Sequence, residues 1–166
     1  MSEASPRVAV VMGSHSDLDV MKRCLEQLEA FGIAHEVRIL SAHRTPAAVE
    51  QFVAEAPGRG VKVFIAAAGM SAALAGAIAA RTTLPVVGVA TASGPLAGMD
   101  ALLSTVQMPP GVPVGCVGMD KAGATNAAVY AAQILAIADP ALAARLAAYK
   151  QAQADKTLAK DAELHG

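Results

Sequence analysis

A histidine and an arginine stand side by side in the segment Ser41-Ala42-His43-Arg44-Thr45-Pro46. A histidine titrates near pH ~6.5, so His43 could take up and return a proton at neutral pH. Arg44 offers a planar fork of donors that suits a phosphate or a carboxylate. The pair predicts acid–base chemistry on an anionic small molecule. Two solvent-facing loop residues before a helix are the simpler alternative.

A second candidate segment, Gly13-Ser14-His15-Ser16-Asp17, leads straight into a predicted helix. Its glycine allows a tight turn, and its hydroxyls together with the first helical N–H groups can hold an anion. Asp17 is suited to accept hydrogen bonds from ribose hydroxyls rather than to meet a phosphate. The alternative is that Ser16 or Asp17 is an ordinary helix N-cap. The segment is neither a P-loop nor the dinucleotide-binding fingerprint.

Small residues form a third candidate segment, Ala68-Gly69-Met70-Ser71, followed by Leu74 at the start of a predicted helix. Such a segment lets a flat ligand lie against the backbone, and it would serve close helix packing equally well. A fourth, Ala92-Ser93-Gly94-Pro95-Leu96, could fold over a ligand. No group of His, Cys, Asp or Glu has the spacing of metal ligands, so we expect no metal site.

The elements that must position these segments alternate between strands and helices. Short β-branched runs separated by helical patterns predict βαβ units and a parallel sheet. The predicted strands are Val8–Met12, His35–Leu40, Val61–Ala67, Pro85–Ala90 and Val114–Val117. The predicted helices include one ended by Pro57-Gly58, then Ser71–Thr82, Met99–Val106, Gly123–Ala138 and a last one that starts at Asp139-Pro140.

Five parallel strands with helices between them predict a three-layer α/β/α sandwich of the flavodoxin-like type. In such open sheets, ligands bind beyond the carboxyl ends of the strands, at the switch point in strand order. The candidate segments follow the first four predicted strands. We therefore expect them to meet at one edge of the sheet.

Composition bounds the remaining possibilities. The chain has 166 residues, of which 54% are hydrophobic and only 3% aromatic, which excludes disorder and suits a single domain over residues 1–166. The start, residues 1–6, is predicted to be flexible. So high an apolar fraction in a short chain favours a homo-oligomer. The C-terminal helix and tail, residues 140–166, are predicted to pack on neighbouring subunits, and the polar tail Gln151–Gly166 is predicted to project from the globule.

Charge and targeting signals argue against several classes of partner. The net charge is −1 and no Lys/Arg block occurs, so we expect neither nucleic acid nor a membrane as partner. The short polar N-terminus lacks the features of a secretory signal, which favours the cytoplasm. Cys24 and Cys116 have no metal or redox spacing, and we expect both thiols to be buried.

Four longer sequence words, in this order, resemble the family of aminoimidazole ribonucleotide (AIR) mutases and carboxylases from about Val8 to Lys150. They are Met12-Gly-Ser-His-Ser-Asp17, Ser41-Ala-His-Arg-Thr-Pro46, Ser104-Thr-Val-Gln-Met-Pro109 with Gly111-Val-Pro-Val-Gly115, and Lys121-Ala-Gly-Ala-Thr-Asn-Ala127. The resemblance implies a cofactor-independent enzyme of purine biosynthesis, usually an octamer. Such an enzyme interconverts N5-carboxyaminoimidazole ribonucleotide (N5-CAIR) and 4-carboxy-5-aminoimidazole ribonucleotide (CAIR).

The family also implies roles for the candidate residues. Ser14 and Asp17 would bind the ribose phosphate, Arg44 would contact the phosphate, and His43 would be the acid and base. CO2 would leave N5 and be recaptured at C4, with His43 giving a proton to N5 and later taking one from C4. The expected substrate-binding residues are Gly13, Ser14, Ser16, Asp17, Ser41, Ala42, Arg44, Gly69, Met70, Ser71 and Leu74.

One departure from the family pattern keeps a second activity open. Met70, Ala73 and Ala75 stand where typical mutases carry Gly, His and Pro, which leans toward the carboxylase branch that uses AIR and CO2 directly. Arg44 and the word from Gln107 to Gly115 look like the mutase branch, which we favour. The third alternative is a non-catalytic nucleotide-binding or receiver-like protein on the same fold.

Overall fold

The computed structural model describes residues 5–165 and contains one five-stranded parallel sheet, of order β2-β1-β3-β4-β5. Residues 1–4 of the predicted flexible start lie outside the described residues. The strands are β1 (Val8–Met12), β2 (His35–Ile39), β3 (Val63–Gly69), β4 (Val86–Thr91) and β5 (Gly115–Met119). The helices are η1 (His15–Asp17), α1 (Leu18–Ala30), α2 (Pro46–Arg59), α3 (Leu74–Ala79), α4 (Met99–Val106), α5 (Asp120–Ala136) and α6 (Pro140–His165).

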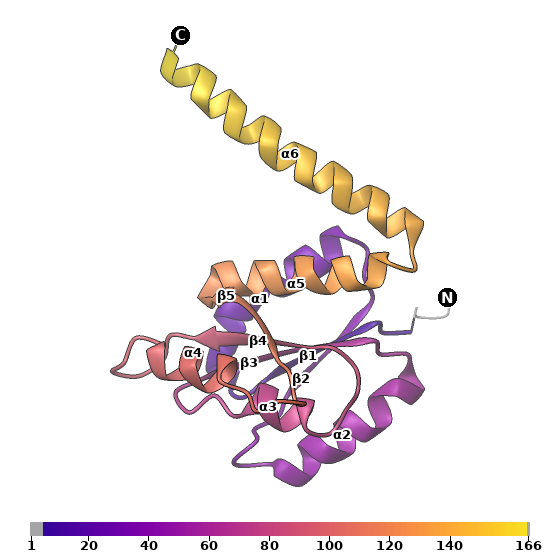
Figure 1. Cartoon of the computed structure of the whole chain (residues 1–166), viewed down its shortest axis with the longest axis vertical. Coiled ribbons are helices and arrows are strands. Elements are labelled where there is room, and N and C mark those ends of the chain that lie inside the picture. The colour runs from indigo at the N-terminus through magenta and orange to yellow at the C-terminus, as the bar shows by residue number, and fades with distance from the viewer. Residues whose placement is uncertain (1–4, 166) are drawn as a thin grey trace.

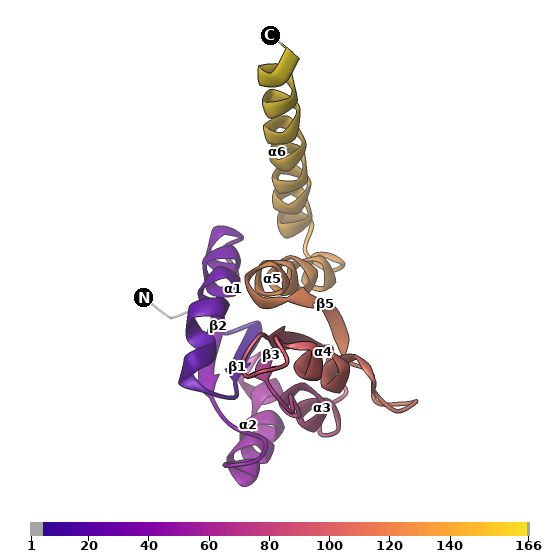
Figure 2. The same cartoon turned by 90° about the vertical axis from the view of Figure 1, so that its left-hand side faces the viewer.

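Side chains of the central strands alternate between two buried cores. Val8, Val10 and Met12 of β1 join the core with α1 and α5, whereas Ala9 and Val11 join the core with α2 and α3. Figures 1 and 2 show these helix pairs on opposite faces of the sheet. The predicted three-layer sandwich is confirmed, and its strand order is that of the flavodoxin-like class.

The strand order reverses between β1 and β3. From β1 the chain passes to β2 on one side, and it then returns to place β3 on the other side. The connections that leave β1 and β3 therefore diverge and leave room between them at the carboxyl ends of the strands.

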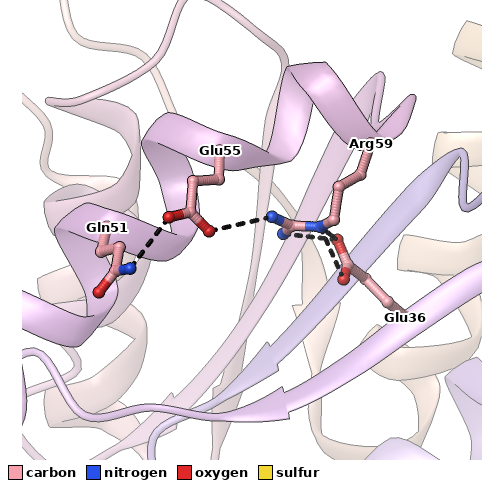
Figure 3. A network of polar contacts seen from close by, with 4 residues as sticks. All are labelled: Glu36, Gln51, Glu55 and Arg59. Carbon is pink, nitrogen blue, oxygen red and sulfur yellow. Dashed lines mark hydrogen bonds and ion pairs between the residues drawn. The ribbon is translucent and has the colours of Figure 1, made fainter.

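Helix α2 runs past its predicted end at Pro57-Gly58 and finishes at Arg59, with Gly60 in the left-handed region. A proline so near the end of a helix removes only one late hydrogen bond. Arg59 gives the last turn a further anchor, because its Nη2 donates to Oε1 of Glu36 on β2 at 2.9 Å (Figure 3). The same guanidinium lies 3.6 Å from Glu55.

Helix α3 begins at Leu74 rather than at the predicted Ser71. Strand β3 continues to Gly69, which pairs with Thr91, and Met70 then adopts a left-handed backbone with φ of +55°. The Ala73 N–H then donates to the Ser71 carbonyl at 2.7 Å, which closes a tight turn before the helix, so Ser71 belongs to the connecting loop.

The long helix α6 leaves the globule. Its first turn is fixed by Asp139, which accepts from the Leu142 N–H at 3.0 Å and from Arg7 Nη1 at 2.7 Å. Leu142 is buried, but every side chain from Gln151 to His165 is exposed. Figures 1 and 2 show this helix pointing away from the sheet.

The two cysteines differ in burial. Burial raises the pKa of the Cys24 thiol to about 12. Cys116 is only partly buried because it lies on the edge strand β5, so the expectation of two buried thiols was wrong for Cys116.

Within residues 5–165, none of the helices combines the length and apolar character needed to cross a bilayer.

The close packing of α5 on strand β5 generates a prediction. A Cβ at Gly123 would overlap the main-chain carbonyl of Gly118, whereas a Cβ at Gly58 in α2 would meet open space. We expect Gly123→Ala to lower the free energy of unfolding by about 1–3 kcal/mol through overpacking. Gly58→Ala should leave it unchanged or raise it by up to about 1 kcal/mol. Urea unfolding of both variants tests the pair, and a Gly123→Ala variant as stable as the parent would contradict it.

Candidate active site

One cleft of about 490 Å³ lies at the carboxyl ends of the strands. The loops after β1, β2, β3 and β4 all contribute to it. All twelve predicted site residues line it, together with Ala68, Ala73 and Ser93: they are Gly13, Ser14, Ser16, Asp17, Ser41, Ala42, His43, Arg44, Gly69, Met70, Ser71 and Leu74. The candidate segments therefore meet at the sheet edge, as the strand-end rule predicts.

The loop after β1 is ordered by its own side chains. Ser14 is the N-cap of η1, and its Oγ accepts from the Ser16 N–H at 3.3 Å. Asp17 closes a capping box, because its Oδ2 accepts from the Ser14 N–H at 3.0 Å. Ser14 therefore caps η1, whereas Asp17 occupies the N-cap position of α1, as the alternative predicted, without a side-chain capping bond to that helix. The hydroxyls of Ser14 and Ser16 lie 2.9 Å apart beside the cleft.

Asp17 is the one charged side chain that is buried within residues 5–165. Its Oδ1 accepts from the Thr91 hydroxyl at 2.9 Å. Burial raises the pKa of Asp17, although the bonds from Thr91 and Ser14 and the charge of Arg44 act in the opposite direction. A carboxylate oxygen has about two acceptor positions, so each oxygen of Asp17 can still accept from a ligand.

The loop after β2 is a tight turn that holds Arg44 against the loop after β1. Thr45 Oγ1 accepts from the Ser41 N–H at 2.9 Å and donates to the Ser41 carbonyl at 3.1 Å. Arg44 Nη2 donates to the Gly13 carbonyl at 2.7 Å. The guanidinium thus joins two loops at one side of the cleft.

His43 occupies the same turn, and its side chain is exposed where it lines the cleft. An exposed imidazole beside a cleft is open to a bound molecule and to proton exchange. Its neighbour Arg44 supplies a fixed positive charge on the same loop.

The loops after β3 and β4 touch each other closely. A Cβ at Gly69 would overlap Oγ of Ser93, and a Cβ at Gly94 would lie 3.5 Å from Cγ of Met70. Met70 is 57% exposed and stands at the mouth of the cleft. Ala73 lines the cleft without a titratable group, whereas Ala75 is buried in the core beside α2.

Sequence reasoning missed Thr91, which lies directly behind Asp17. A signal was present, because Thr91 is the only polar side chain in the strand Val86–Thr91 and stands at its carboxyl end. Ser93 was recognised only as part of a segment that could fold over a ligand. Within the described residues 5–165, no group of three His, Cys, Asp or Glu side chains could hold a metal ion.

A flavodoxin-like sheet whose switch point carries paired hydroxyls, a buried carboxylate and a His-Arg turn defines an α/β protein built to hold a small anionic molecule. The sequence profile of AIR carboxylase matches residues 7–156. The chain belongs to the AIR carboxylase family.

Similar proteins agree with this assignment. The chain is 51% identical to an N5-carboxyaminoimidazole ribonucleotide mutase of Brucella melitensis, over 89% of this chain and 91% of that protein. It is 49% identical to the protein of the same name from Escherichia coli K12, over 92% of this chain and 90% of that protein. The crystal structure of Treponema denticola PurE superposes with a TM-score of 0.86 at 30% identity, and the match covers 96% of this chain and 98% of that one.

The buried Asp17 carboxylate predicts an unusual pH dependence of stability. Its raised pKa means that the folded state binds this proton more tightly than the unfolded state, so ionisation weakens the fold. Stability from this group is therefore lost as pH rises through its raised pKa. We expect Asp17→Asn to gain stability over the parent as pH increases from about 4 toward neutrality.

Asp19 provides the matched control. Hydrogen bonding and the charge of Lys121 lower its pKa, so its contribution is lost as pH falls instead. Urea unfolding of Asp17→Asn, Asp19→Asn and the parent across this pH range should give slopes of opposite sign for the two variants. A pH-independent difference between Asp17→Asn and the parent would contradict the prediction.

Proposed function

We propose that this protein interconverts N5-CAIR and CAIR in purine biosynthesis, as the names of its relatives at about 50% identity suggest. The observation that carries the proposal is the meeting of Ser14, Asp17, His43 and Arg44 in one cleft. Two sequence-distant loops supply a phosphate cradle, a ribose acceptor and a proton carrier within the reach of one nucleotide.

Binding of the nucleotide follows from the chemistry of each loop. The phosphate lies at the Ser14 hydroxyl, near the N-terminus of η1, and at the Arg44 guanidinium. The ribose hydroxyls donate to Asp17. The imidazole then lies between His43 and the backbone of Gly69 and Met70, where the absence of a side chain on Gly69 allows close approach.

The proposed reaction needs one proton carrier. As the N5–carboxyl bond breaks, its electron pair stays on N5 and takes a proton from His43, which releases CO2. C4 then attacks the CO2 carbon, and the C4 proton passes to His43 to restore it. Ala68, Ala73 and Leu74 line the cleft with apolar surface, which would hold CO2 near C4. No cofactor or metal enters these steps.

The AIR carboxylase activity is the second candidate. Ala73 gives the cleft no imidazole at the place where typical mutases carry one, and Met70 adds a flexible thioether at the mouth. These two residues favour direct use of AIR and CO2. The mutase remains our proposal because the matched relatives at 45–51% identity carry that name.

We further propose that the chain works as a cytoplasmic homo-oligomer, with the octamer as the expected form. Met99, Leu103 and Val106 are exposed at spacings of four and three residues, which gives α4 an apolar stripe without cover in the single chain, and the exposed Leu96 lies in the turn before it. The exposed part of α6 would pack on a neighbouring subunit. Light scattering should report a mass several times that of the chain, and a monomer would refute this proposal.

Replacement of the proposed proton carrier tests the activity. His43→Asn keeps a polar side chain that cannot exchange a proton near neutral pH, so kcat with N5-CAIR should fall by about 100-fold or more. Binding of the nucleotide, measured by calorimetry, should change little. His35→Asn is the control, because His35 bonds the Ile33 carbonyl at the start of β2, outside the cleft, and its kcat should equal that of the parent.

The same assay separates the candidate activities. The mutase predicts efficient turnover of N5-CAIR and sluggish turnover of AIR with bicarbonate at low substrate. The reverse order would overturn the mutase in favour of the carboxylase. Undiminished turnover of N5-CAIR by His43→Asn would remove His43 from the mechanism.

A further inference from the structure

Thr91 is a buried polar side chain among apolar neighbours on its strand. It ends β4, whose other side chains are apolar, and it is only 3% exposed. Its hydroxyl donates to Oδ1 of Asp17 at 2.9 Å, across 74 residues of sequence. This bond joins the carboxyl end of β4 to the loop after β1.

Each oxygen of the Asp17 carboxylate accepts a hydrogen bond. Thr91 holds Oδ1, and the Ser14 N–H holds Oδ2 at 3.0 Å. Two donors on opposite oxygens fix the plane of the carboxylate as well as its position. They also favour its ionised form, which burial alone disfavours.

The neighbouring strand makes room for this contact. Gly69 pairs with Thr91 in the sheet, and a Cβ at Gly69 would lie 2.8 Å from Oγ1 of Thr91. Any larger residue at position 69 would press on the hydroxyl that holds Asp17. The bond therefore depends on β3, on β4 and on the loop after β1.

We propose that Thr91 is a positioning residue, which acts through Asp17 by holding its carboxylate oriented to accept from the ribose hydroxyls of the nucleotide. This inference rests on the proposed function. Thr91 itself does not line the cleft. Its effect on substrate passes through the carboxylate.

Arg44 is the charged side chain that acts on Asp17 among the residues of the neighbouring elements. Arg44 on the loop after β2 stabilises the carboxylate, and His43 and His15 are the titratable groups of the adjoining loops. Asp19 of α1 pairs with Lys121 of α5 at 3.0 Å. Strands β3 and β4 carry no ionisable side chain. Removal of the Thr91 hydroxyl therefore takes away one hydrogen bond to Asp17 and leaves the charges of these groups unchanged.

Thr91→Val tests the inference because valine keeps the shape and loses the hydroxyl. With N5-CAIR as substrate, KM should rise about tenfold, in line with a lost hydrogen bond to a charged group, while kcat changes less. The acid limb of kcat/KM should move to higher pH, because the remaining donors stabilise the ionised carboxylate less well. Thr91→Ser, which keeps a hydroxyl at this position, should have the KM and the acid limb of the parent.

Thr105→Val is the matched control. Thr105 is equally buried, but its hydroxyl donates to the Ala101 carbonyl within α4 at 2.8 Å. Its loss should lower stability without any change in KM or in the acid limb. Unchanged KM and acid limb in Thr91→Val, or a Thr91→Ser variant that fails to recover them, would overturn the inference.

A measurement without turnover separates this inference from the proposed function. Thr91→Val should steepen the loss of stability between about pH 4 and pH 7 in urea unfolding, and the steepening should vanish in an Asp17→Asn background. Equal steepening in both backgrounds, or none in either, would overturn the inference. Failure of the parent to convert either N5-CAIR or AIR with bicarbonate would overturn the proposed function. That result would also end the ribose role of Thr91, but not its coupling to Asp17.

Discussion

The reversal of strand order between β1 and β3 is the constraint on which the cleft depends. Two adjacent parallel strands send the chain in opposite directions, so no connection crosses the space above their carboxyl ends. The loops after β2 and β4 then close that space from the sides. This topology brings the loops that carry the polar groups together, and their hydrogen bonds then fix each group in place.

Small residues convert this topology into a shaped site. Gly69 brings the end of β3 against Ser93, and Ala68 and Ala73 add small apolar side chains to the lining of the cleft. The hydrogen bond from Arg44 to the Gly13 carbonyl then ties the loops after β1 and β2 together. The backbone supplies much of the shape, and a few side chains supply the chemistry.

Much of this arrangement could be predicted from the sequence because its signals are local. The continuous apolar run Val8–Met12 is a strand buried on both faces, and the helix Met99–Val106 lies where its pattern predicts it. The strand-end rule then brings the candidate segments together without any knowledge of side-chain contacts. The meeting of His43 with Asp17 in one cleft is a consequence of that rule.

The features that escaped prediction depend on contacts across the sheet. The bond from Thr91 to Asp17 joins residues far apart in sequence, and no local pattern specifies it. Helix α2 continues past Pro57 to Arg59, whose guanidinium donates a hydrogen bond to Glu36 on β2. Helix α3 starts after a turn in which Met70 is left-handed and the Ala73 N–H donates to the Ser71 carbonyl, and these residue types do not mark such a turn.

Helix α6 has a thermodynamic consequence for the whole molecule. Its last turns, from Gln151 to His165, bury nothing against their own chain, and isolated helices of this length are only marginally stable in water. Any helical order there that exceeds the intrinsic propensity must come from association. In the oligomer proposed above, mass action would make the helix content of this segment rise with protein concentration, so that order at the C-terminus would report the degree of assembly.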